Sequence, residues 1–205
     1  MIAGYEHRFV ASSRGIDAPT LLLLHGTGGN EDDLVPLGQT LLPDANLLSP
    51  RGNVLENGMP RFFRRLAEGV FDLKDLALRT EELGRFIVEA AGQYPIDTAR
   101  VIAVGYSNGA NIVASLLLRQ PERLSAAILL HPMVPFEPDS VPDLAGKPVF
   151  ISAGRNDPIV PVENTRRLVA LLESANGKVT VNWHDAGHSL TRQEATAARD
   201  WLASL

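Results

Sequence analysis

The chain has 205 residues, of which 45% are hydrophobic and 21% charged, and its formal net charge is −5. This balance is typical of one soluble globular domain over residues 1–205, and the acidic charge argues against nucleic acid or an anionic membrane as the main partner. There is no cysteine, which excludes disulfides, a thiol nucleophile and thiolate metal sites.

The amino-terminal residues MIAGYEHRFV lack the charged segment and apolar core of a secretory signal. The longest apolar stretches are far too short to span a membrane. We therefore expect a cytoplasmic protein without stable membrane insertion. The basic cluster RFFRR (61–65) is interpreted as a solvated face rather than a binding stripe.

In chain order, residues 6–12 are a weak candidate for an edge strand, and the apolar run at 21–24 predicts a strand buried on both faces. Residues 30–42 predict a short helix with acidic residues in its first turn, and 46–48 predict a second buried strand. Residues 73–93 predict a long amphipathic helix that ends near Gly92 and Pro95. The apolar stripe of this helix carries Leu76, Leu83, Phe86, Ile87 and Ala90.

The second half of the chain repeats this pattern. Buried strands are predicted at 101–104, 126–130 and 149–152, and helices at 108–119, 162–175 and 190–204. The last helix is expected to face inward through Ala195, Ala198, Trp201 and Leu202. Residues 178–183 alternate as an edge strand does. The proline-rich segment 132–148 is irregular, and it could form a pocket wall or serve only as a connection.

Strand and helix in repeated alternation predict an α/β fold, with a mostly parallel sheet that helices cover on both faces. Functional residues of such sheets lie in loops at the carboxyl ends of the strands. The chain has little room for a large lid domain, so we expect an open site.

Two glycine-containing loops follow predicted strands. HGTGGN (25–30) could be a flexible turn or one half of an oxyanion hole, whereas the spacings of phosphate-binding loops are absent. GYSNG (105–109) matches the G-x-S-x-G elbow, which would present Ser107 on a tight turn between a strand and a helix. The position between strand and helix makes a nucleophile the favoured interpretation.

Candidates for an acid and a base follow the two last strands. Asp157 could be a turn residue before Pro158 or the acid that orients a histidine. His188 is favoured as the base over His184, which lies at the strand's end. Asp185 is a rival acid, but it belongs to the same loop as the histidines. The order Ser107, Asp157, His188 is that of α/β-hydrolases.

These motifs together resemble the small carboxylesterase/phospholipase family of α/β-hydrolases, which includes the acyl-protein thioesterases. The resemblance runs through LLLLHGTGGNEDDLVPL, SPRGN, RFFRR, VIAVGYSNGAN, ILLHPMVP, ISAGRNDPIVP and DAGHSL. It is strongest to the bacterial branch of carboxylesterases and hydroquinone-associated hydrolases. The thioesterases usually carry Gln and Leu where this chain has Asn108 and Thr27, which argues against acyl-protein substrates.

The resemblance implies a carboxylesterase that acts through Ser107, His188 and Asp157, with thioester or lysophospholipid hydrolysis as the near alternative. The backbone N–H groups of Thr27 and Asn108 would form the oxyanion hole. No metal or organic cofactor is required. A non-catalytic binding protein of the same fold is the alternative from another class.

Four residues are candidates to bind the small-molecule ester. Arg51 could meet a polar substrate group, although a structural ion pair is at least as plausible for it, and three apolar residues could line a pocket or belong to the core: Met59, Phe62 and Phe63. An exposed surface helix could form a homodimer, but nothing in the sequence requires one.

Overall fold

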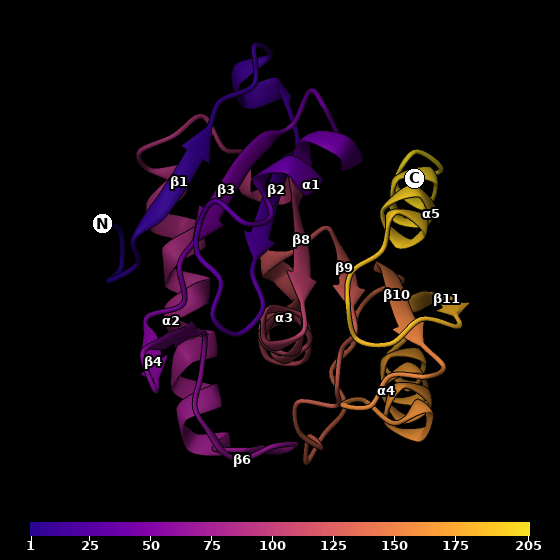
Figure 1. Cartoon of the computed structure of the whole chain (residues 1–205). Coiled ribbons are helices and arrows are strands. Elements are labelled where there is room, and N and C mark those ends of the chain that lie inside the picture. Colours follow the sequence, from indigo (N-terminus) through magenta and orange to yellow (C-terminus); the bar gives the residue numbers. More distant parts are fainter.

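The structure, a computed structural model, describes all residues from 1 to 205 and contains a seven-stranded sheet (Figure 1). Its strands are β1 (His7–Val10), β2 (Thr20–Leu24), β3 (Asn46–Pro50), β8 (Val101–Tyr106), β9 (Ala126–Leu130), β10 (Pro148–Gly154) and β11 (Lys178–His184). The α-helices are α1 (Val35–Leu41), α2 (Leu73–Ala91), α3 (Asn108–Arg119), α4 (Val162–Ser174) and α5 (Arg192–Leu202). Short 3₁₀ turns lie at Gly15–Asp17, Thr98–Arg100 and Pro121–Arg123.

The strand order is β1-β3-β2-β8-β9-β10-β11. Every neighbouring pair is parallel except β1 and β3, which run antiparallel at one edge. The predicted α/β class is thereby confirmed, with 6–12 and 178–183 supplying the two edge strands. After β2 the chain re-enters the sheet on one side, at β3, and after β8 it re-enters on the other side, at β9. The loops after β2 and β8 therefore diverge, and a crevice is expected between the carboxyl ends of these two strands.

Two apolar cores, one on each face of the sheet, hold the layers together. The side chains of Leu22 and Leu24 join the larger core with α2, α3 and α4, whereas Leu21 and Leu23 join the smaller core with α1 and α5. Successive strand residues point to opposite faces. All four leucines are fully buried, which explains why the run is apolar without alternation.

Helix α1 begins later than the sequence predicts. Acidic residues are absent from its first turn, because they lie in the preceding turn. There the Asn30 side chain accepts a hydrogen bond from the Asp32 backbone N–H at 2.8 Å, and the Asp33 carboxylate accepts one from the Asn30 N–H at 3.3 Å. Asx hydrogen bonds of this kind compete with helix formation and delay its start.

Two short hairpins between β3 and α2 were not predicted. One pairs β4 (Val54–Glu56) with β5 (Met59–Arg61), and the other pairs β6 (Arg65–Ala67) with β7 (Val70–Phe71). The first turns at Asn57 and Gly58, which both have positive φ, so an Asn-Gly turn signal was present in the sequence. The strands are too short to show a hydrophobic period.

Segment 132–148 is irregular, as predicted, and side-chain amides anchor its start. The Met133 N–H donates to Asn111 Oδ1 at 2.7 Å, and the Val134 N–H donates to Asn164 Oδ1 at 2.8 Å. The segment is thus held against α3 and α4 at the carboxyl edge of the sheet. None of the helices combines the length and the apolar character needed to cross a membrane.

Candidate active site

Ser107 lies on a strained turn between β8 and α3. Its φ of 52° and ψ of −113° are rare for any residue other than glycine. The Ser107 N–H donates to Leu130 O at 2.9 Å, and the Ser107 carbonyl accepts from the Asn111 N–H at 3.0 Å. These bonds to β9 and α3 hold the strained turn in place, so the hydroxyl projects beyond the sheet.

The glycines on either side of this turn are required by close backbone packing. A Cβ on Gly105 would lie 2.5 Å from Gly109 O and 2.6 Å from Ala110 N. A Cβ on Gly109 would lie 2.5 Å from the carbonyl carbon of Leu24 and 2.6 Å from His25 O. Helix α3 can therefore start directly against β2 only because both positions lack a side chain.

The structure brings Ser107, His188 and Asp157 into one hydrogen-bonded chain. Ser107 Oγ lies 2.9 Å from His188 Nε2, and His188 Nδ1 lies 2.7 Å from Asp157 Oδ2. The Tyr106 hydroxyl donates to His188 O at 2.8 Å and fixes the loop that carries the imidazole. This geometry is that of a nucleophile, a base and an orienting acid.

Asp157 is held as a carboxylate. Its side chain is 1% exposed, and burial alone would raise its pKa. Hydrogen bonds from His188, from the backbone N–H groups of Val160 and Ile159, and from His131 outweigh burial and bring the pKa of Asp157 below its ordinary value. A buried negative charge can therefore orient His188 at neutral pH.

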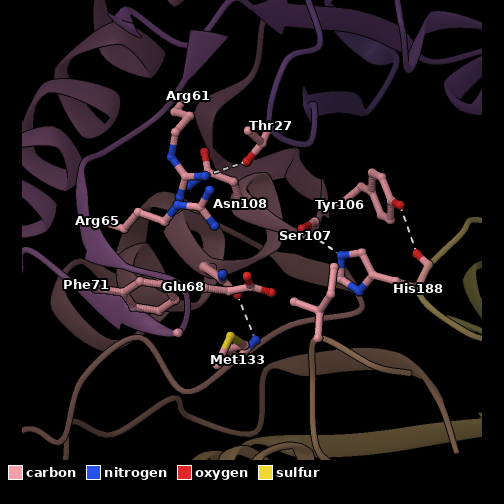
Figure 2. A pocket seen from close by; sticks show the side chains of 13 residues that line it. Thr27, Arg61, Arg65, Glu68, Phe71, Tyr106, Ser107, Asn108, Met133 and His188 are labelled. Carbon is pink, nitrogen blue, oxygen red and sulfur yellow. Dashed lines mark hydrogen bonds between the residues drawn. The ribbon is translucent and has the colours of Figure 1, made fainter. Parts of the chain in front are cut away.

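Thr27 and Asn108 follow the adjacent strands β2 and β8, at the expected crevice. The Thr27 N–H donates no hydrogen bond within the chain. Asn108 opens α3, and the first N–H groups of a helix have no intrahelical acceptor. Both residues line the same pocket as Ser107 (Figure 2).

The 61–63 segment holds the side chains of both residues predicted to form the oxyanion hole. Arg61 Nη1 donates to Thr27 Oγ1 at 2.6 Å (Figure 2). The Phe62 N–H donates to Asn108 Oδ1 at 2.8 Å. Arg61 is only 3% exposed, so the interpretation of RFFRR as a solvated face is wrong at this position. Its charge is paired with Glu56 at 3.1 Å, which makes burial of the guanidinium tolerable.

His25 connects the glycine loop to the loop after β3. Its Nδ1 lies 2.6 Å from Gly26 O, and its Nε2 accepts a hydrogen bond from the Gly52 N–H at 2.9 Å. The ring is therefore neutral with the proton on Nδ1. Burial lowers the pKa of His25, which is consistent with this state.

A pocket of about 360 Å³ opens beside Ser107 (Figure 2). It is lined by Thr27, Arg61, Arg65, Glu68, Gly69, Phe71, Tyr106, Ser107, Asn108, Asn111, Met133, Ile159 and His188. Met133 belongs to the 132–148 segment, whose start therefore forms part of the pocket wall. The second hairpin forms an adjacent part of the wall through Arg65, Glu68, Gly69 and Phe71, which the sequence had not indicated.

The structure does not place the four predicted substrate-binding residues in this lining. Arg51 forms ion pairs with Glu31 at 2.5 Å and Glu6 at 2.8 Å. The other three candidates are two core residues and one at an exposed hairpin: Phe62, Phe63 and Met59. A sequence cannot tell a core phenylalanine from a pocket phenylalanine, because both avoid water.

The structure also separates the rival acid and base candidates from Ser107. His184 is buried at the end of β11, and its Nε2 lies 3.0 Å from Glu194 Oε1. The side chain of Asp185 is 88% exposed and pairs with Arg155 at 3.8 Å. His188 and Asp157 are thus the pair that reaches Ser107.

A cluster of buried titratable residues lies directly behind the triad. His131, directly after β9, lies between Asp157 and Glu194, and His184 contacts the same oxygen of Glu194 as His131 does. The nitrogen and oxygen atoms of His131, His184 and Glu194 are close enough together to be considered as metal ligands. No sequence motif indicated this cluster; the capping box of Thr191 and Glu194 predicts only a helix start.

Comparison with known proteins agrees with this architecture. The model of the dienelactone hydrolase family matches residues 70–203. MhqD of Bacillus subtilis (strain 168), a protein named as a hydrolase, is 56% identical over 188 residues, which are 92% of this chain and 94% of MhqD. A Bacillus cereus carboxylesterase structure is 52% identical with a TM-score of 0.95, covering 98% of this chain and 94% of its own. A carboxylesterase structure from Mesorhizobium loti is 32% identical with a TM-score of 0.89, covering 100% of this chain and 96% of its own.

Proposed function

The chain belongs to the dienelactone hydrolase family of α/β-hydrolases, and on that premise we propose that it cleaves carboxylic esters through an acyl-enzyme intermediate. The observation that carries this proposal is the 2.9 Å contact between Ser107 Oγ and His188 Nε2, on a strained turn that faces a pocket. The similarity to the two carboxylesterase structures supports the same reaction class.

In the acylation step, Ser107 Oγ attacks the ester carbonyl carbon while His188 Nε2 takes the hydroxyl proton. Since His188 Nδ1 lies 2.7 Å from Asp157 Oδ2, the carboxylate holds the proton on Nδ1 and leaves Nε2 free to accept. The tetrahedral intermediate then collapses, the bond to the alkoxy oxygen breaks, and His188 returns the proton to the departing alcohol.

The negative charge on the carbonyl oxygen of the intermediate would be stabilised by the backbone N–H groups of Thr27 and Asn108. One such donor is typically worth about 3 kcal/mol of transition-state stabilisation. The positive end of α3 adds to the field at the same point. In deacylation His188 accepts a proton from water while the water oxygen attacks the acyl carbon. The bond to Ser107 Oγ then breaks, His188 returns the proton to Oγ, and the acid leaves. Protein groups supply every step, so this proposal requires no metal or organic cofactor.

The pocket favours small, uncharged esters. Its volume of about 360 Å³ lies at the lower end of the range for small-molecule sites. Arg61 and Arg65 both pair with Glu56, and Glu68 adds a further negative charge, so the pocket offers no excess of either sign. Only four of its thirteen lining residues are hydrophobic, which argues against long acyl chains.

A fluorophosphonate probe tests the assignment of the nucleophile. Such a probe phosphonylates an activated serine, and we expect one modified site per chain at Ser107, located by peptide mass spectrometry. Labelling should be absent in Ser107→Ala and at least about 10²-fold slower in His188→Ala. Ser125→Ala is the matched control, since Ser125 precedes β9, its hydroxyl donates to Val101 O of β8, and it has no place in the proposal. Unchanged labelling of Ser107→Ala would refute the assignment.

A series of p-nitrophenyl esters tests the substrate class. We expect kcat/KM to be highest for acetate and propionate and to fall steadily from butyrate to octanoate. A matched pair of phenyl acetate and phenyl thioacetate separates an esterase from a thioesterase. Rising activity with chain length, or a large preference for the thioester, would contradict the proposal. Absence of any turnover, together with absence of labelling, would favour a binding protein.

A further inference from the structure

The proposed mechanism does not use His131, a buried residue that contacts the carboxylate of Asp157. Asp157 Oδ2 lies 2.7 Å from His188 Nδ1 and also 3.0 Å from His131 Nδ1. The side chain of His131 is completely buried, and its ring centroid lies 5.1 Å from that of His188. One carboxylate oxygen thus receives two imidazoles, of which only one belongs to the triad.

The second nitrogen of His131 faces another carboxylate. Its Nε2 lies 2.9 Å from Oε1 of Glu194, whose side chain is completely buried. The N–H direction is not well aligned with this oxygen, so the contact is a close approach rather than a linear hydrogen bond. A deprotonated Nε2 would place its lone pair beside a carboxylate oxygen, which is repulsive. The surroundings therefore favour a proton on both nitrogens.

The hydrogen-bond donors around Glu194 favour its ionised form. Its Oε2 accepts hydrogen bonds from the N–H and the hydroxyl of Thr191, both at 2.9 Å, and its Oε1 accepts one from the Ser152 hydroxyl at 3.0 Å. His184 Nε2 lies 3.0 Å from the same Oε1. Such a set of donors stabilises the anion, and a buried anion requires a cation nearby. His131 is the group that lies between this anion and Asp157.

From this geometry, and given the proposed function, we propose that His131 is a positioning residue that carries a positive charge between Asp157 and Glu194 and thereby sets the pH at which the catalytic base loses activity. The ionisable groups that face it are Asp157, Glu194, His184, His188 and Tyr106. Tyr106 is occupied as a donor to His188 O.

The direction of the His131 pKa agrees with this proposal. Burial lowers the pKa of His131, but the contacts with Glu194 and Asp157 outweigh burial and raise it above its ordinary value. The positive charge opposes protonation of the neighbouring His188, because like charges at this separation repel strongly in a buried site. It therefore keeps His188 available as a base at more acidic pH.

A metal ion in place of the charged imidazole is less consistent with the distances. Neighbouring ligands of a tetrahedral zinc ion lie about 3.3 Å apart, given metal–ligand bonds of about 2.0 Å. Glu194 Oε1 lies 2.9 and 3.0 Å from the two histidine nitrogens and already accepts the Ser152 hydroxyl. Both separations are shorter than the ligand–ligand distance of a tetrahedral site.

His131→Asn tests the role of the charge. The φ of His131 is 54°, a conformation that asparagine tolerates well, and its amide can still donate toward Asp157. We expect the acidic limb of the pH profile, measured as the rate of fluorophosphonate labelling and as kcat/KM for p-nitrophenyl acetate, to move up by about one to two pH units. Activity at pH 9 should stay within about tenfold of the unaltered protein.

His184→Asn is the matched control, because His184 touches Glu194 but not Asp157. We expect its acidic limb to stay within about 0.3 pH units of the unaltered protein, since the charge next to Asp157 is retained. A folded His131→Asn variant with an unshifted acidic limb would overturn the proposal. An equal shift in both variants would overturn it too, because it would indicate a general disturbance of the buried cluster.

A measurement on the unaltered protein covers the case in which His131→Asn does not fold. Nitrogen-15 NMR of the imidazole rings at pH 7.5 should show His131 protonated at both nitrogens, and a single protonated nitrogen would overturn the proposal. One equivalent of bound zinc by elemental analysis would also overturn it. This measurement needs no turnover, whereas the proposed function is tested by the labelling of Ser107. The two experiments therefore distinguish a failure of the His131 inference from a failure of the proposed function.

Discussion

Gly109→Ala is the change whose effect on both folding and activity follows most directly from the structure. The added Cβ would lie 2.5 Å from the carbonyl carbon of Leu24 and 2.6 Å from His25 O, and its contact with Leu24 O would be closer still. Ordinary contacts begin at 3.4 Å, so the overlap is 0.9 Å (3.4 − 2.5) with the carbon atom and 0.8 Å (3.4 − 2.6) with the oxygen. The obstructing atoms are backbone atoms and cannot rotate away.

The size of the effect depends on how rigidly the obstructing backbone is held. Leu24 is the last residue of β2 and pairs with Gly105 of β8, so the sheet anchors the backbone that obstructs the new Cβ. Overpacking of a core typically costs about 1–3 kcal/mol, and we expect Gly109→Ala to lie at the upper end, about 3 kcal/mol. A displacement of the elbow by a large fraction of an ångström should lower kcat/KM by about 10²-fold.

Two measurements test this expectation: the free energy of unfolding from urea denaturation, and kcat/KM for p-nitrophenyl acetate. Gly187→Ala is the matched control, because it also lies beside a triad residue. Its Cβ would meet only Asn156 O at 3.6 Å and Pro158 Cδ at 3.7 Å, which are ordinary contacts. We expect changes within about 1 kcal/mol and threefold for this control. A Gly109→Ala protein as stable and as active as the control would refute the packing argument for the elbow.

Three further predictions concern the groups around the triad. Asp157→Asn should lower kcat by about 10³- to 10⁴-fold in steady-state ester hydrolysis, because the amide cannot hold the imidazole tautomer; a loss below tenfold would contradict the assigned role. Arg61→Met should lower kcat/KM about tenfold, because the 2.6 Å bond to Thr27 Oγ1 is lost, and an unchanged value would show that this bond does not position the loop. Burial raises the pKa of Glu194, but its contacts, chiefly that with His131, lower this pKa to about 2. The Glu194 carboxylate therefore contributes to the free energy of unfolding above the unfolded pKa of 4.5, and this contribution is lost as pH falls toward 2. The pKa of His131 is raised in the folded protein, so the stability contributed by its positive charge is fully present below pH 6.5. This contribution is lost as pH rises through the pKa of His131 in the folded protein. Urea denaturation should therefore show the largest cost of Glu194→Gln, about 3 kcal/mol, between about pH 4.5 and 6.5, and a cost that does not vary with pH would contradict this.

The local pattern of the sequence predicted the sheet and most of its helices. Apolar runs at 21–24 and 126–130 indicated strands covered on both faces, and the two cores explain why. The start of α1 and the two short hairpins at 54–71 were not predicted. Side-chain hydrogen bonds of Asn30 and Asp33 delay the helix, and strands of two or three residues show no period.

The sequence by itself determined which residues could act as nucleophile, acid and base, because the carboxyl ends of parallel strands meet at one edge of the sheet. Ser107, Asp157 and His188 each follow a different strand, so their order along the chain was enough to nominate them. The same argument placed Thr27 in the loop after β2. These predictions needed only residue types, glycine spacing and the alternation of strand and helix.

Only the tertiary structure decided which side chains are buried together. Arg51 pairs with Glu31, Arg61 is buried against Thr27, and His131 lies between Asp157 and Glu194. Each of these contacts joins segments that are 20 or more residues apart, and nothing in the local sequence specifies the partner. Burial and charge pairing depend on how the layers pack, so the second carboxylate contact of His131 could emerge only once the layers were in place.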